Sequence, residues 1–430
     1  MRLKPDSAPR TTDRSFAPKL SRVWSFLLIV LWLDRPPGSL FAQTWFTDAF
    51  LPSTTAASAD SAQIPGLLRI GPIIVDVDST AEIEHTDNVN FSPVAQPGTE
   101  LSAGIGFNAA WQALQAAQFK ISGAWEMNKW ITGPGPNQAT FTVTPGSTLR
   151  YSIYVETIQL TPFVNLKRTY DPGLAPTVGD TAIFEQSSYD VGLQLAVPLH
   201  NLNLEFMGLR GLNTSSGSGG VANIDTDRRL ASARLVREFN SRLQGGVEYY
   251  ALAENFKNAP AEGSTSETAR VFSMAQLTAT LHLVVALGVE EVNYTQPAMA
   301  GDSTRDSQPI ADLELSDFLR ENLSCALQVS DQVADNYSTD YYRTLSVGLS
   351  VAFKFNQWMS LSAAANWQHI VESSLTQGSG DVWDNRAHLQ VTVSDKLSLH
   401  LDAGILSNQV AAAGQGYSQK RLELGASRRF

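Results

Sequence analysis

The chain has 430 residues, of which 43% are hydrophobic, and it carries 31 basic and 42 acidic side chains. Beyond the N-terminus no apolar run reaches the roughly 20 residues of a membrane helix, so helical spans are excluded there. The acidic balance argues against general binding of nucleic acid. A single cysteine, Cys325, excludes an intrachain disulfide and a cysteine-based metal cluster.

The first 42 residues have the pattern of a secretory signal peptide. Six basic residues precede an apolar run over residues 24–33, and small residues then lead to a candidate cleavage site after Ala42. An uncleaved anchor and a start codon placed too early are the alternatives. We expect residues 43–70, rich in Ser, Thr, Ala and Pro, to form a periplasmic lead-in. A barrel is then expected over residues 71–430.

From residue 73 onward, apolar and polar residues alternate in long segments. Leu345, Val347 and Leu349 alternate with Thr344, Ser346 and Gly348, for example. Successive side chains on a strand point to opposite faces, so these segments predict strands with one apolar and one polar face. A soluble periplasmic β-sandwich would show the same alternation.

The connections between the segments distinguish these folds. Short turns, such as residues 356–357 and 395–396, alternate with longer polar links, such as 133–147 and 296–307. Transmembrane barrels have this asymmetry, with tight periplasmic turns and longer external loops. The sequence therefore predicts an all-β, antiparallel, up-and-down transmembrane β-barrel in the bacterial outer membrane.

We predict about 18 strands, with 16 as the alternative because the region 133–172 is ambiguous. The predicted strands are 73–89, 101–113, 117–132, 148–160, 162–171, 186–198, 201–213, 227–239, 242–256, 268–280, 282–295, 308–317, 321–335, 341–355, 358–372, 381–394, 397–409 and 417–430.

The polar face of these strands predicts the lining of a pore. Barrels of 16 to 18 strands are wide enough to enclose water, and charges in a dry core would be too costly. The candidate lining residues are Arg234, Glu248, Glu254, His282, Glu290, Lys354, His388, His400, Asp402 and Glu423. A plugged lumen with structural ion pairs is the alternative. The loops 172–186 and 214–226 are candidates for narrowing the channel.

No catalytic or cofactor motif emerges from the sequence. The six histidines are scattered without metal-ligand spacing, and nucleophile-elbow and P-loop patterns are absent. We therefore expect no enzymatic activity, no cofactor and no bound metal.

The last strand resembles the assembly signal of bacterial outer-membrane proteins. Leu422, Leu424, Ala426 and Phe430 match its alternating apolar pattern, whereas Arg428 departs from it. The opening Ile70-Gly71-Pro72 and the Asp87-Asn88-Val89 segment resemble uncharacterised porin-like barrels. The resemblance implies a barrel that contacts the barrel-assembly machinery during biogenesis, then outer-membrane lipid and lipopolysaccharide. It implies no reaction, substrate or oligomeric state.

The function predicted first is a passive, porin-like channel for small polar solutes or ions. An export or assembly barrel for a surface polysaccharide is the second hypothesis, and a non-conducting structural surface protein is the third.

Overall fold

The computed structural model describes residues 68–89, 94–114, 116–134, 139–169, 184–217, 225–257, 263–295, 304–320, 322–335, 341–372, 379–410 and 416–430. The predicted signal peptide, nearly all of the predicted lead-in and most of the two loops expected to narrow the channel lie outside these residues.

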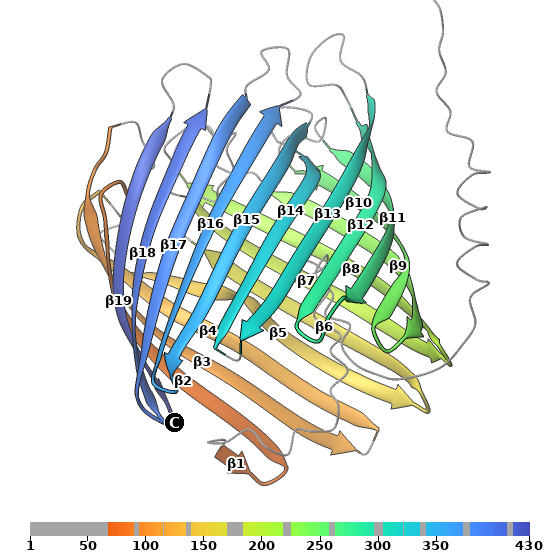
Figure 1. The fold of residues 1–430 in the computed structure, drawn as a ribbon, viewed down its shortest axis with the longest axis horizontal. Helices are drawn as coiled ribbons and strands as arrows, with labels where there is room; N and C mark the ends of the chain where they lie inside the picture. The colour runs from red at the N-terminus through yellow and green to blue at the C-terminus, as the bar shows by residue number, and fades with distance from the viewer. Residues whose placement is uncertain are drawn as a thin grey trace, which may run out of the picture.

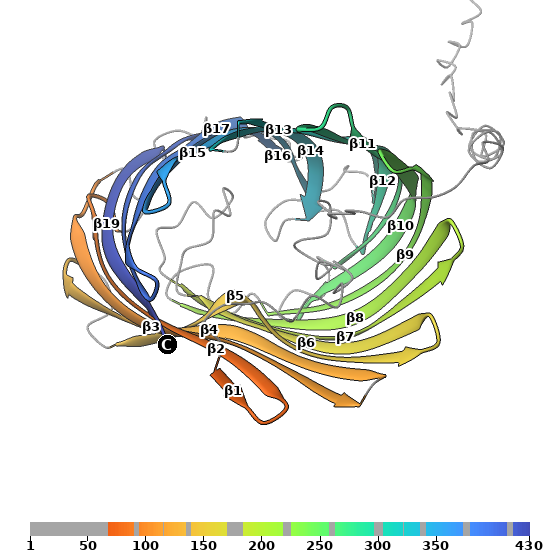
Figure 2. The same cartoon turned by 60° about the horizontal axis from the view of Figure 1, so that its bottom comes forward.

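Eighteen antiparallel strands form a closed barrel (Figures 1 and 2). They are β2 (Ile73–Thr86), β3 (Gly98–Leu114), β4 (Ala117–Thr132), β5 (Thr140–Val155), β6 (Ile158–Thr169), β7 (Phe184–Leu199), β8 (Leu202–Gly217), β9 (Thr226–Asn240), β10 (Leu243–Phe256), β11 (Ser264–Gln276), β12 (Leu281–Tyr294), β13 (Arg305–Arg320), β14 (Leu323–Asp335), β15 (Tyr341–Asn356), β16 (Met359–Glu372), β17 (Ser379–Ser394), β18 (Leu397–Val410) and β19 (Tyr417–Arg429). Each strand pairs with the next in sequence, and β19 pairs with β2 to close the ring. The predicted barrel of about 18 strands is confirmed.

A nineteenth strand lies outside the ring. The short β1 (Leu68–Ile70) forms a hairpin with the start of β2, with Ile70 opposite Ile73. In Figure 2 this hairpin projects from the outer side of the barrel wall. The last three residues of the predicted lead-in therefore form a strand that the sequence did not predict.

The predicted strand limits are most wrong between residues 133 and 172. There the structure has β5 and β6 joined by a turn at residues 156–157, where Glu156 adopts a φ of 56°. We predicted a loop over 133–147, but residues 140–147 belong to β5. The polar Thr, Pro, Gly and Ser residues of this segment are typical of a loop, which explains the error.

The middle of β5 contains a bulge at Pro145 and Gly146. Gly146 has a φ of 92°, a left-handed value that glycine adopts without steric cost. The pairing register with β4 and with β6 shifts at this point. Thr144 donates a side-chain hydrogen bond of 2.7 Å to the Ala124 carbonyl across the bulge. A bulge of this kind bends a strand, and β5 bends toward the lumen in Figure 2.

The outer face of the barrel is apolar. Its exposed large side chains include Leu101, Ile105, Leu193, Val271, Leu287, Leu349, Leu399, Leu401, Leu422 and Leu424. An apolar surface of this extent is unfavourable in water, but it is suited to contact the lipid tails of a membrane. The aromatic residues Trp111 and Phe355 lie near the short-turn end of the same face and are also exposed.

The residues of the predicted assembly signal lie on the closing strand. Leu422, Leu424 and Ala426 of β19 face outward, and Phe430 follows the end of that strand. The Phe430 amide donates a hydrogen bond of 3.0 Å to the carbonyl of Val77 on β2. Recognition of these residues by the assembly machinery stays a prediction.

Candidate channel lumen

Strand register defines the inner face of the barrel. In β11, buried residues at even positions alternate with exposed residues at odd positions, so Arg270 points inward and Val271 points outward. The register then assigns inward positions to neighbouring strands, because side chains of paired residues lie on the same face. Arg270 pairs with Glu248, which pairs with Arg234.

All ten residues predicted to line a pore occupy inward positions. Arg234, Glu248, Glu254, His282 and Glu290 lie on β9, β10 and β12, and Lys354, His388, His400, Asp402 and Glu423 lie on β15 and β17–β19. The structure brings Arg234 and Glu248 into one group and His388, His400, Asp402 and Glu423 into another, whereas Glu254, His282, Glu290 and Lys354 lie outside both groups. Their role in conduction stays a prediction.

The first group is a buried ladder of charges across β8 to β13. Arg234 lies 3.9 Å from Glu205. Arg270 lies 3.7 Å from Glu248 and 3.3 Å from Asp312. All five side chains are less than a tenth exposed. Positive and negative side chains alternate along the ladder, so each arginine faces at least one carboxylate. This pairing offsets the cost of burying the charges.

Aromatic rings support the two arginines of the ladder. The Arg234 guanidinium lies 4.4 Å from the centre of the Phe272 ring, and the Arg270 guanidinium lies 5.0 Å from that of Tyr250. A ring face attracts a cation at this distance. Beside the ladder, Phe163, Met207, Leu209 and Leu230 form a buried apolar cluster. The inward side chains of this part of the wall are therefore largely shielded from solvent.

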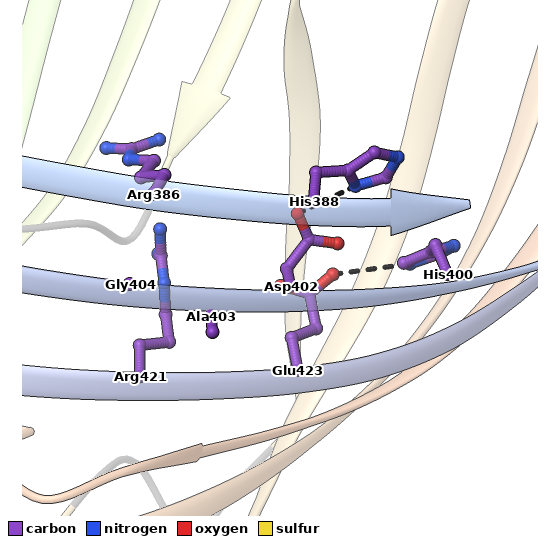
Figure 3. A pocket seen from close by; sticks show the side chains of 8 residues that line it. All are labelled: Arg386, His388, His400, Asp402, Ala403, Gly404, Arg421 and Glu423. Atoms are coloured by element: carbon purple, nitrogen blue, oxygen red, sulfur yellow. Dashed lines mark hydrogen bonds and ion pairs between the residues drawn. The ribbon is translucent and has the colours of Figure 1, made fainter. Parts of the chain in front are cut away.

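The second group surrounds a pocket of about 370 Å³ on the inner wall (Figure 3). The pocket is lined by Arg386, His388, His400, Asp402, Ala403, Gly404, Arg421 and Glu423, which come from β17, β18 and β19. His388 Nδ1 lies 2.8 Å from Asp402 Oδ1, and the His388 and His400 rings stack with their centres 5.9 Å apart. The pocket therefore presents imidazoles, carboxylates and guanidinium groups to one space.

Several inward side chains on this side of the barrel are exposed. The Arg386 side chain is 55% exposed, although it pairs with Asp384 at 2.7 Å. Ser350 and Lys354 of β15 are exposed as well, on the inward face. The lumen is thus asymmetric. The described inward side chains are mostly buried on β8–β13 and more exposed on β14–β19, which we call the wetted side.

Several important inward residues were not among the predicted ones. Glu205, Arg270, Asp312, Arg386 and Arg421 are central to the two groups. Strand alternation already marked their positions as polar-facing. The missing information was register, which decides which inward charges become neighbours.

Comparison with known proteins identifies the fold. No family model matches the chain, and no curated protein matches it. The crystal structure of Pseudomonas aeruginosa OccK7 (OpdD) superposes with a TM-score of 0.51 at 11% identity, covering 84% of this chain and 99% of that one. The structure of OccK2 (OpdF) from the same organism, in complex with glucuronate, gives a TM-score of 0.50 at 12% identity and covers 83% and 98%.

At this level of identity the likeness concerns the fold alone. No helix long and apolar enough to cross a bilayer occurs among the residues that the structure describes. The apolar outer face and the polar lumen complete the agreement with the porin architecture. The chain is an outer-membrane β-barrel with the 18-stranded porin fold.

Proposed function

We propose that the protein is a passive channel for small polar solutes or ions, open along the wetted side of its lumen. The observation that carries the proposal is the exposure of inward polar side chains on β15 and β17, above all Lys354 and Arg386. An 18-stranded barrel is wide enough for a water-filled path. Diffusion through that path needs no catalytic group.

The charges of the inner face favour cations. Acidic side chains outnumber basic ones at the described inward positions. The acidic residues are Asp76, Asp78, Glu82, Glu84, Glu100, Glu126, Asp190, Glu205, Glu238, Glu248, Glu254, Glu290, Asp306, Asp312, Glu314, Asp384, Asp402 and Glu423; the basic ones are Lys120, Arg150, Lys167, Arg228, Arg234, Arg270, Lys354, Arg386, Arg421 and Arg429. A cleft with one dominant sign of charge concentrates ions of the other sign.

Single-channel recording tests the proposal directly. In planar bilayers with a KCl gradient, the purified barrel should give reproducible conductance steps and a reversal potential that indicates preference for K⁺ over Cl⁻. Silence from protein shown to be folded in the membrane would refute the passive channel and leave the exporter or the structural protein. Steps that favour Cl⁻ would refute the charge argument but keep the channel.

Reversing one lumen charge should change the selectivity. Arg386→Glu exchanges a solvent-exposed inward cation for an anion, so we expect a larger reversal potential in the cation direction. Lys396→Glu makes the same charge change in the short turn between β17 and β18, away from the lumen wall. It should shift the reversal potential much less. Equal shifts would mean that the current does not pass along β17.

We further propose that the outward apolar face contacts outer-membrane lipid and lipopolysaccharide, and that the barrel-assembly machinery inserts the chain. Leu422 and Leu424, both more than half exposed on β19, support the second point. We propose no enzymatic reaction for this barrel.

A further inference from the structure

Three potential metal ligands meet where the barrel closes. Glu82 lies on β2, His400 on β18 and Glu423 on β19, and these three strands are adjacent. His400 Nε2 lies 3.4 Å from Glu423 Oε1 and 3.5 Å from Glu82 Oε1. One ligand atom from each residue lies within 4.8 Å of the other two. Figure 3 shows the Glu423 carboxylate directed at the His400 ring.

A glycine leaves the space that this arrangement needs. Gly425 pairs with His400 on one side and with Glu82 on the other. A Cβ atom at residue 425 would lie 2.2 Å from His400 Nε2 and 2.6 Å from Glu82 Cγ, closer than non-bonded atoms approach. Only glycine at this position allows the imidazole to lie across β19 and reach both carboxylates.

Neighbouring groups orient the ligands. Ser102 Oγ donates a hydrogen bond of 3.3 Å to Glu82 Oε2, the oxygen that does not face His400. The His388 ring, held by Asp402, stacks on the His400 ring. Partners of this kind fix the rotation of first-sphere ligands in metal sites.

The distances match a tetrahedral metal site. Zinc binds imidazole nitrogen and carboxylate oxygen at about 2.0–2.2 Å, which separates tetrahedral ligand atoms by roughly 3.3–3.6 Å. The two separations from His400 Nε2 fall in this range, and the Glu82 and Glu423 oxygens lie within 4.8 Å of each other. Imidazole and carboxylate together favour a divalent transition metal over Mg²⁺ or Ca²⁺, which take oxygen ligands.

The charge of the three side chains and their position beside the pocket also favour a metal ion. Two carboxylates beside one imidazole are neutralised by a divalent cation, whereas a protonated histidine supplies only one positive charge. His400 and Glu423 also line the pocket on the lumen wall. Water or a solute in that pocket can occupy the remaining coordination position of a four-coordinate ion.

We propose that Glu82, His400 and Glu423 bind one divalent transition-metal ion of the Zn²⁺ class on the inner wall of the barrel, with one coordination position open to the pocket. The proposal goes beyond channel activity and does not depend on conduction. It makes the seam between β18, β19 and β2 a ligand-binding site.

Calorimetric titration with ZnCl₂ tests the site in the refolded, tag-free barrel, after treatment with a chelator and its removal. We expect one Zn²⁺ per chain, and a loss of affinity of at least about tenfold in His400→Gln and in Glu423→Gln. His282→Gln removes an inward histidine on β12 and should leave binding unchanged. Circular dichroism and heat-modifiable gel migration verify that each variant is folded.

Co²⁺ gives an independent readout of the geometry. Bound at this site, it should develop the intense visible absorption of a four-coordinate ion, and His400→Gln should abolish it. The proposal is overturned if the folded barrel binds neither metal, or if His400→Gln binds as the unaltered chain does. Both measurements are made without a current, so their failure is separate from failure of the channel proposal.

Discussion

Arg270→Met should lower the free energy of unfolding of the barrel by about 3–5 kcal/mol. Arg270 is buried on the inner face between Glu248 and Asp312, with the Tyr250 ring beside its guanidinium group. Methionine fills much of the same space but leaves two buried carboxylates without this cation. We attribute most of the lost stability to those two carboxylates. A buried charge that loses its partner is no longer compensated for its lost hydration.

Two further variants separate this explanation from a simple loss of packing. Adding Glu248→Gln and Asp312→Asn to Arg270→Met removes the two carboxylate charges that Arg270 faced, so most of the lost stability should return. Arg386→Met breaks an exposed ion pair with Asp384 and should cost at most about 1 kcal/mol. Denaturant unfolding of the barrel in lipid vesicles measures all three. An Arg270→Met barrel as stable as the Arg386→Met barrel would show that the ladder is hydrated.

The sequence predicts the barrel well because a transmembrane strand has a strict period. Inward and outward side chains must alternate in every strand, so His388 and Leu389 are assigned to opposite faces without knowledge of the neighbours. Turn residues such as Gln357 and Lys396 then separate the strands. The prediction fails at Pro145 and Gly146, where residues typical of a loop form a bulge inside β5.

The two charged groups could not be predicted in the same way. Alternation places His400 and Glu423 on the inner face, but it does not say that they face each other across β18 and β19, nor that Glu82 joins them. That contact brings together residues more than 300 positions apart in the chain, through closure of the ring. Strand register and closure of the ring are properties of the whole sheet, so they cannot be predicted from the residue pattern of a single strand.

The assignment of the two faces leads to a second large effect, on the outside of the barrel. Leu349 and Ser350 are adjacent near the middle of β15. Leu349 faces outward and is 51% exposed, and Ser350 faces the lumen. Leu349→Arg should lower the free energy of unfolding in lipid vesicles by about 2–4 kcal/mol, the cost of an arginine on the lipid face near the midplane.

Ser350→Arg is the matched control, because it introduces the same side chain one residue away on the same strand. Its guanidinium group would project into the wetted lumen, where water solvates it, so we expect a change below about 1 kcal/mol. Reversible denaturant unfolding followed by tryptophan fluorescence measures both variants against the unaltered barrel. Similar losses for the two variants would mean that the lumen beside β15 excludes water, and the proposed channel would then lose its path. If Leu349→Arg lowers the free energy of unfolding much more than Ser350→Arg does, β15 has lipid on one face and water on the other. Solutes can cross the membrane along this wall only under that condition.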